Sequence, residues 1–93
     1  MNNNYKKGRR NEYRTMRLLE ASGYLCFRTA GSHSPFDVVA VNSCGILLVQ
    51  CKSNEWPSPA ECETIHNIAV PTNASKLVHR WDDRVAMPKV KEV

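Results

Sequence analysis

The spacing of apolar side chains along the chain first predicts a helix. In the segment GRRNEYRTMRLLEASGY, Tyr13, Met16 and Leu19 or Ala21 recur at helical intervals on one side, and arginines occupy the other. Gly23 stands where a glycine commonly follows the last turn of a helix. We therefore expect an amphipathic helix that ends before Gly23.

Three runs rich in branched and aromatic side chains come next and predict strands. They cover Tyr24–Thr29, Phe36–Asn42 and Ile46–Lys52, and a turn at Cys44-Gly45 joins the second run to the third as a hairpin. Both arms of the hairpin are almost continuously apolar, a pattern typical of strands covered on two faces. The hairpin is therefore expected to lie inside the fold.

A second helix is predicted from its punctuation. Ser58 suits the N-cap, Pro59 suits the first helical position, and Glu61 completes an S-x-x-E capping box. The segment VPTN at residues 70–73 must end this helix, so it is short.

Two further strands are expected after it, over Ser75–Trp81 and Val85–Val90. Pro88 cannot donate a backbone hydrogen bond, so the last strand should lie at an edge. The predicted order is α-β-β-β-α-β-β, an α/β fold in a single domain over residues 1–93.

The charge is uneven and changes the picture of the first helix. The chain has 93 residues and a net charge of +4. Residues 1–17 contain one acid, Glu12, and the bases Lys6, Lys7, Arg9, Arg10, Arg14 and Arg17. Such a segment favours a polyanionic partner, nucleic acid above all, with residues 1–7 as a flexible basic leader. The alternative is a solvated helix face with a soluble tail.

The cysteines and the hydropathy exclude other classes. Cys26, Cys44, Cys51 and Cys62 have no C-x-x-C or metal-ligand spacing, which indicates free thiols in a reducing compartment. The longest apolar run, Ile46–Val49, is far too short to cross a bilayer. A cytoplasmic protein without a membrane partner is expected.

Polar groups at the ends of the hairpin suggest chemistry. Gln50 and Lys52 point to one face of their strand, and antiparallel pairing brings Asp37 close to them. An acid with a second oxygen ligand suits Mg²⁺, and a nearby lysine can stabilise charge on a phosphorane or help deprotonate water. This predicts metal-assisted phosphodiester hydrolysis. The alternative is a strand-end ion pair between Asp37 and Lys52, with Gln50 as a surface amide.

Residues 8–52 resemble the archaeal Holliday junction resolvases of the PD-(D/E)XK nuclease superfamily. The resemblance rests on the G-x-x-x-E spacing of Gly8 and Glu12, the R-x-A-G-S loop after the first strand, the P-x-D that contains Asp37, and the x-x-K that ends in Lys52. It implies a restriction-endonuclease-like three-layer core, in which helices flank a mixed sheet.

The resemblance also implies roles for single residues. Asp37 would bind the metal, Lys52 would be the catalytic lysine, and Glu12 would be an outer metal ligand or would orient water. For Glu12 the alternative is a cap or an ion pair with neighbouring arginines. Gln50 falls where the family has a second metal-binding carboxylate, and its neutral amide is a weaker ligand that some nucleases of the superfamily use.

DNA contacts follow from the same resemblance. Arg28 and Ser32 would contact the scissile or an adjacent phosphate, and Gly31 would allow close backbone approach. His33 lies in the same loop and could bind phosphate, but the absence of a role is favoured. The helix residue after Glu12, basic in the resolvases, is Tyr13 here, but the helix remains positive through Arg9, Arg10 and Arg14.

The favoured hypothesis is an Mg²⁺-dependent endonuclease, with Mn²⁺ as a substitute, that resolves branched DNA as a homodimer. A flap or nicking nuclease fits the same motif. A non-catalytic DNA-binding module on a decayed nuclease fold, marked by Gln50, is the second class, and a small α/β protein with structural polar strand ends is the third. A chain of this size would suit a virus or mobile element.

The remaining candidates are weaker. Trp56 and Trp81 could stack on bases, but core or dimer packing is favoured for both. His66 and His79 lack paired ligand spacing and are expected to be structural. Glu61 and Glu63 suit the first turn of the second helix, and either could replace the charge missing at Gln50.

Overall fold

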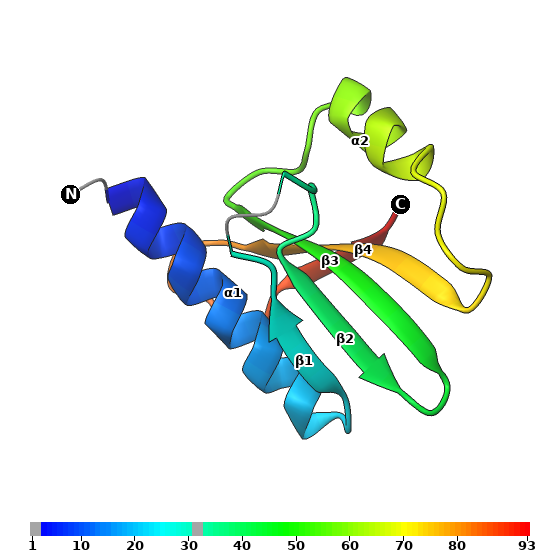
Figure 1. The fold of residues 1–93 in the computed structure, drawn as a ribbon. Coiled ribbons are helices and arrows are strands. Elements are labelled where there is room, and N and C mark those ends of the chain that lie inside the picture. The colour runs from blue at the N-terminus through cyan, green and yellow to red at the C-terminus, as the bar shows by residue number, and fades with distance from the viewer. Residues whose placement is uncertain (1–2, 31–32) are drawn as a thin grey trace.

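The computed structural model describes residues 3–30 and 33–93, which form one five-stranded sheet with two helices (Figure 1). The sheet order is β1-β2-β3-β4-β5; β3 and β4 run parallel, and the other neighbours are antiparallel. The sheet is therefore mixed, as predicted for the α/β fold. The elements are α1 (Asn3–Ala21), β1 (Leu25–Arg28), β2 (Val38–Asn42), β3 (Gly45–Ser53), α2 (Pro59–His66), β4 (Ala74–Trp81) and β5 (Lys89–Glu92).

Helix α1 starts earlier than the sequence predicts and ends as expected. It begins at Asn3, so residues 3–7 of the expected leader are helical. At the other end, Gly23 has φ +94°, its N–H donates to Glu20 O, and the Tyr24 N–H donates to Leu19 O. These two bonds form a Schellman motif, which satisfies the last carbonyl groups of the helix.

The buried side of α1 agrees with the predicted one only in part. Leu19 is buried and Met16 packs against the core, as expected, but Tyr13 is 43% exposed and Ala21 is also exposed, whereas Asn11 and Thr15 are buried. The prediction missed these two polar residues because apolar character was used to choose the face. The polar side chains of Asn11 and Thr15 are buried because both have hydrogen-bond partners in the sheet.

The β2–β3 hairpin forms at the predicted turn. Asn42 Oδ1 accepts hydrogen bonds from the N–H groups of Cys44 (2.8 Å) and Gly45 (3.1 Å). Gly45 is required by space as well, because a Cβ there would collide with the carbonyl oxygen of Asn73. Residues Val38, Ala40 and Val49 of the hairpin are fully buried beneath α1 and form the centre of the core.

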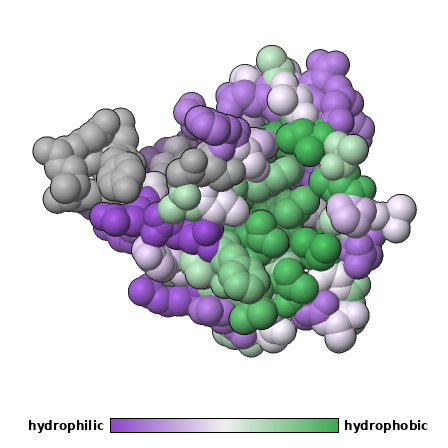
Figure 2. Space-filling model, viewed as in Figure 1, coloured by the Kyte–Doolittle hydropathy of each residue, from purple (hydrophilic) through white to green (hydrophobic). Residues whose placement is uncertain are grey.

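The opposite face of the sheet is only partly covered, which corrects the expectation of two covered faces. Leu25, Phe27 and Val41 are 64%, 52% and 36% exposed. Figure 2 shows this apolar surface over the strands of the β2–β3 hairpin. Helix α2 covers this face near the ends of β3 and β4. It lines a pocket with Gln50, and Lys76 Nζ donates to His66 O (2.7 Å) and to Ile68 O just beyond the helix (2.6 Å). The layer formed by α2 is therefore incomplete.

The later elements follow their predicted punctuation except at one boundary. Ser58, Pro59 and Glu61 form the expected N-cap, first position and capping box of α2. Strand β5 lies at the edge, but it begins at Lys89 and not at Val85. Proline at 88 has no N–H for the ladder, so residues 82–88 form a loop instead. No helix in the described part of the chain is long and apolar enough to cross a membrane.

Candidate active site

Asp37 is fixed beside Gln50 by backbone hydrogen bonds. Its N–H donates to Val49 O (2.8 Å), and its Oδ2 accepts from the Cys51 N–H (2.9 Å). The two bonds lie on either side of Gln50 in the sequence of β3. Asp37 therefore lies against the backbone on either side of Gln50 at the end of the hairpin, as the predicted pairing requires.

Gln50 has an unusual environment for an amide. Its Oε1 is buried and has no hydrogen-bond partner among the described residues. Burying such an acceptor without a partner costs about 1–3 kcal/mol, so this oxygen is a ready site for a donor or a cation. The alternative prediction of a surface amide is wrong, because the oxygen is not exposed.

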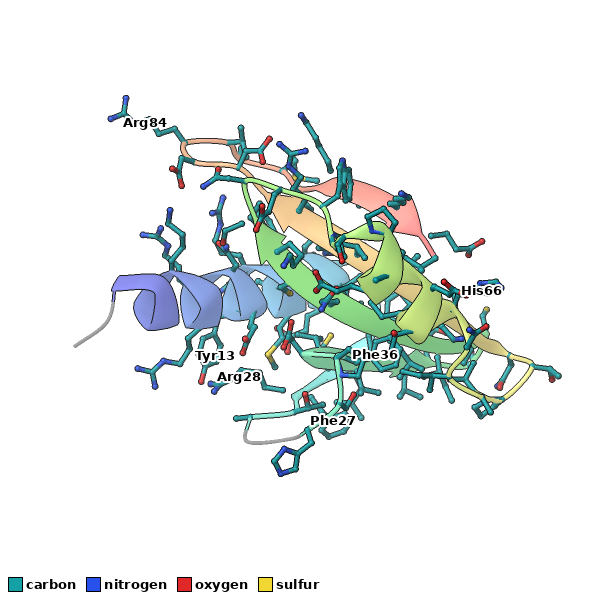
Figure 3. The ribbon with its side chains drawn as sticks, turned by 90° about the horizontal axis from the view of Figure 1, so that it is seen from above. Tyr13, Phe27, Arg28, Phe36, His66 and Arg84 are labelled. Carbon is teal, nitrogen blue, oxygen red and sulfur yellow. The ribbon has the colours of Figure 1, made fainter. Side chains whose placement is uncertain are left out.

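Glu12 reaches the same region from α1 and is paired with Arg28. Arg28 Nε lies 3.0 Å from Glu12 Oε1, although the N–H direction is not that of a hydrogen bond. The guanidinium also donates to the Tyr13 hydroxyl (2.8 Å) and lies over the Tyr13 ring (5.0 Å). Figure 3 shows Tyr13 and Arg28 together beside α1. Tyr13 thus holds Arg28 in place.

Burial makes both carboxyl groups harder to ionise. Desolvation raises the pKa of Asp37, against the Cys51 N–H bond and the charge of Lys52, which lower it. Desolvation also raises the pKa of Glu12, assisted by the negative charge of Asp37 and opposed by Arg28. The influence of Asp37 on the pKa of Glu12 places the two acids in one electrostatic site. A cation bound nearby would stabilise the ionised form of carboxyl groups whose pKa is raised in this way.

Lys52 completes the cluster on its solvent side. It lines a cleft of about 320 Å³ together with Lys7 of α1 and Ser53 and Glu55 at the end of β3. Its charge lowers the pKa of both Asp37 and Glu61. The structure therefore brings Glu12, Asp37 and Lys52 into one site next to Gln50.

The predicted DNA-binding arginines separate into different environments. Arg9 lies on the side of Glu12, whose pKa it lowers, whereas Arg10 faces Asp83. Arg14 donates to Val85 O (2.5 Å) and stacks on Trp81 (4.1 Å), so it is engaged inside the protein. Ser32 and Gly31 lie outside the described residues.

A buried polar network next to the site was not foreseen. Thr15 Oγ1 accepts from Trp81 Nε1 (2.9 Å) and from the Cys51 thiol (3.4 Å) and lies 3.2 Å from His79 Nδ1. Since two donors already point at Oγ1, its own hydrogen is directed to Nδ1, which requires a neutral imidazole. We call Thr15, Cys51, His79 and Trp81 the Thr15 network. Trp81 and His79 are thereby structural, as predicted.

Two neighbours of Glu12 could have signalled this arrangement. Asn11 and Thr15 are four residues apart, on either side of Glu12, and both bond to the strand ends, with Asn11 Nδ2 donating to Ser53 Oγ (2.7 Å). Polar residues at this spacing on an otherwise apolar helix face indicate buried hydrogen bonds. They fix the helix turn that carries Glu12.

The minor candidates remain outside the cluster. Glu61 accepts from Ser58 N–H in the capping box (3.2 Å), yet it also lines a pocket of about 230 Å³ with Gln50. The Trp56 ring lies beside Arg80 (5.5 Å) and Lys91 (5.9 Å). Glu63, His66 and His33 are exposed.

The oxygen atoms of the candidate site suit a hard cation that takes only a few of its ligands from the protein. No group of three or more His, Cys, Asp or Glu side chains among the described residues could hold a metal ion. The candidate oxygens are instead the carboxylates of Asp37 and Glu12, and the buried amide oxygen of Gln50, which follows the Asp37-bonded carbonyl of Val49 in β3. Mg²⁺ commonly binds through one or two carboxylates and keeps water and phosphate as its other ligands.

Comparisons with known proteins indicate the family and the fold of the chain. A family model described as archaeal Holliday junction resolvase (hjc) matches residues 3–65, more than half of the chain. Among solved structures, the chain is similar to Archaeoglobus fulgidus Hjc, a Holliday junction resolvase from an archaeal hyperthermophile. The two share 27% identity and a TM-score of 0.72 over 91% of this chain and 76% of that one. No curated protein sequence matches significantly.

Proposed function

The chain belongs to the archaeal Holliday junction resolvase family, and we propose that it is a nuclease that hydrolyses phosphodiester bonds of Holliday junctions. One observation carries the proposal for the site. Asp37 is fixed by the Cys51 N–H within electrostatic reach of Lys52, and its N–H bonds to the carbonyl before Gln50, whose Oε1 is buried with no hydrogen-bond partner among the described residues. The substrate is DNA, so the place of action is inside the cell.

Mg²⁺, with Mn²⁺ as a substitute, is the proposed cofactor. Asp37 and the Gln50 amide oxygen would hold the ion, with Glu12 as an outer ligand. Bound there, the ion would neutralise phosphate charge and make water more acidic. A cation would relieve both the unpartnered oxygen of Gln50 and the raised pKa of Asp37. The weaker amide ligand implies lower metal affinity than a carboxylate would give.

The side chains around Asp37 supply the remaining chemistry. Lys52 would stabilise negative charge that develops on the phosphate. Glu12 would orient the attacking water once Arg28, its present partner, turns to a phosphate oxygen. Arg9 would add positive charge beside Glu12 on the DNA side. The catalytic set is thus Glu12, Asp37, Gln50 and Lys52.

The open face of the sheet supports the proposed homodimer. Leu25, Val41 and Ile46 lie across one row of strand partners, and Phe27, Val39 and Leu48 lie across the next. Such a continuous apolar face can pair with itself around a two-fold axis, which gives the two sites needed to cut two strands.

The dimer is tested by its hydrodynamic mass. Phe27→Glu should convert a dimer to a monomer in sedimentation equilibrium, because it places charge in the centre of the apolar face. Tyr13→Glu, which changes a residue of similar exposure on α1, is the matched control and should stay dimeric. A monomeric wild type would contradict the dimer.

The activity is tested on a panel of labelled DNAs: a four-way junction, a flap, a nicked duplex and a linear duplex. We expect Mg²⁺-dependent cutting of the junction in preference to the other three. Equal cutting of all four would favour a less selective nuclease. Junction binding without cutting in Mg²⁺ or Mn²⁺ would favour a DNA-binding module on a decayed nuclease fold.

A further inference from the structure

A basic cleft lies between α1 and the loop that joins β4 to β5. The loop comprises residues 82–88, and the cleft has a volume of about 510 Å³. We call it the α1–loop cleft. Its lining contains three guanidinium groups and one carboxylate, and consists of Arg10, Arg14, Asp83, Arg84 and Val85.

The loop is held against its neighbours at several points. Lys7 Nζ lies 2.9 Å from Asp83 Oδ1, and Arg14 donates to Val85 O (2.5 Å). The Asp83 N–H donates to Asn54 Oδ1 (2.8 Å), just after β3. These contacts fix the loop relative to α1 and to the end of β3. The cleft is therefore held open by specific contacts between the loop and its neighbours.

Two of the three arginines in the cleft have positive charge available for a ligand. Asp83 is paired with Lys7, and Arg14 is used within the protein. Arg10 and Arg84 are exposed and have no hydrogen bond or ion pair within the described part of the chain. Guanidinium groups of this kind match the oxygens of phosphate groups.

The backbone of the loop keeps Arg84 at its tip. Arg84 has φ +64°, a left-handed conformation that costs a non-glycine residue roughly 1 kcal/mol. Figure 3 shows its side chain directed away from the body, on the side of α1 opposite Tyr13 and Arg28. Arg84 and Arg28 thus lie on the two flanks of the helix that carries Glu12.

The cleft is continuous with the candidate active site through one residue. Lys7 pairs with Asp83 at the cleft and also lines the cleft that contains Lys52. A DNA strand whose phosphate lies at Asp37 and Lys52 would therefore pass Lys7 before reaching Arg10 and Arg84. Basic side chains line this path, and the carboxylate of Asp83, which also lies on it, is paired with Lys7.

We propose that the α1–loop cleft binds the DNA backbone next to the scissile phosphate, with Arg84 and Arg10 as the phosphate-binding residues. This inference rests on the proposed nuclease function. It adds a contact from the far end of the chain, outside the matched residues 3–65. A duplex arm of the junction would thereby be held on the flank of α1 away from Arg28.

The test is the salt dependence of junction binding by the full chain, measured by fluorescence anisotropy in EDTA to prevent cutting. For duplex DNA the slope of log affinity against log salt changes by about 0.9 for each phosphate contact. Arg84→Gln and Arg10→Gln should each flatten the slope by about 0.9, and the double variant by about 1.8. Lys91→Gln is the matched control, because Lys91 pairs with Val78 on the face opposite α1.

The outcomes separate this inference from the function on which it rests. A wild type that binds and cuts junctions, together with an unchanged slope in the folded double variant, would overturn the cleft alone. A wild type without salt-dependent DNA binding would overturn both. Displacement of the junction by poly-glutamate at equal charge concentration would show a general polyanion or acidic-protein surface and would also overturn the proposal. Melting temperatures of the variants verify their folding.

Discussion

Residues 50, 51 and 52 of β3 belong to two polar clusters with opposite properties. Cys51 joins the Thr15 network, in which the hydroxyl of Thr15 is bonded to three neighbours. Gln50 and Lys52 belong to the candidate active site with Glu12 and Asp37, where the Gln50 amide oxygen has no hydrogen-bond partner in the described part of the chain and two carboxyl groups have raised pKa values. Side chains alternate faces along a strand, so Cys51 points to the Thr15 network and Gln50 and Lys52 point to the other face.

The difference teaches how to distinguish a structural from a reactive polar cluster. Buried polar groups that satisfy one another stabilise the fold, because no desolvation cost remains unmet. Groups held close but left unsatisfied cost stability and are available to a metal ion or substrate. The same comparison predicts that changes in the two clusters act on different measurements.

The largest effect on stability is expected from Thr15→Val. The change keeps the shape but leaves Trp81 Nε1–H and His79 Nδ1 without their partner, which costs about 2–4 kcal/mol. Urea unfolding followed by circular dichroism measures it. Thr15→Ser keeps the hydroxyl and should cost less than half as much. Equal losses in both variants would show that the methyl group, and not the hydroxyl, holds the network.

A similar effect is expected from acidification, through His79. Desolvation lowers the pKa of His79 from 6.5 to about 4. Between pH 6.5 and about 4, His79 is therefore protonated in the unfolded chain but neutral in the folded one. The free energy of unfolding consequently falls as the pH is lowered from 6.5 to about 4, by at most about 3 kcal/mol. Unfolding free energies at pH 7 and pH 4 measure it. His79→Gln should show a smaller difference between these two pH values than the wild type does.

A smaller effect is expected from Gln50→Glu, which tests whether the reactive cluster of Glu12, Asp37, Gln50 and Lys52 binds the metal ion. Gln50→Glu should tighten metal binding by about tenfold, because a carboxylate replaces a neutral amide oxygen. Without metal, the added acid should lower the melting temperature, since it is buried near Asp37. Differential scanning calorimetry with and without Mn²⁺ measures both effects, and Glu63→Gln is a surface control. Metal binding that is unchanged by Gln50→Glu would place the ion elsewhere.

The smallest effect has an unexpected sign. Because the pKa of Asp37 is raised, its stabilising contribution is present when it is protonated and is lost as the pH rises through the folded pKa. Asp37→Asn removes this penalty and can still accept from the Cys51 N–H. We expect a higher melting temperature than wild type at pH 7 and no advantage at pH 3. A lower melting temperature at pH 7 would assign Asp37 a structural role.

The sequence predicts the reactive cluster better than the structural one. Turn chemistry at Asn42–Gly45 and strict alternation in β3 are local signals, so the meeting of Asp37 with Gln50 could be foreseen. For the Thr15 network, the spacing of Asn11 and Thr15 could indicate buried polar residues, but the partner of Thr15 could not be foreseen, because Thr15 and His79 are 64 residues apart in the sequence. The pairing of Glu12 with Arg28 also depends on how α1 packs on β1, which no local pattern fixes.

The most direct test of the account is the rate at which Asp37→Asn cuts a four-way junction in Mg²⁺, at DNA concentrations that saturate binding. We expect a loss of at least about a hundredfold, with junction affinity retained and the fold at least as stable as that of wild type. Thr15→Val, assayed at a temperature where it is folded, should keep most of the rate. Full cutting by Asp37→Asn would contradict the assignment of the reactive cluster.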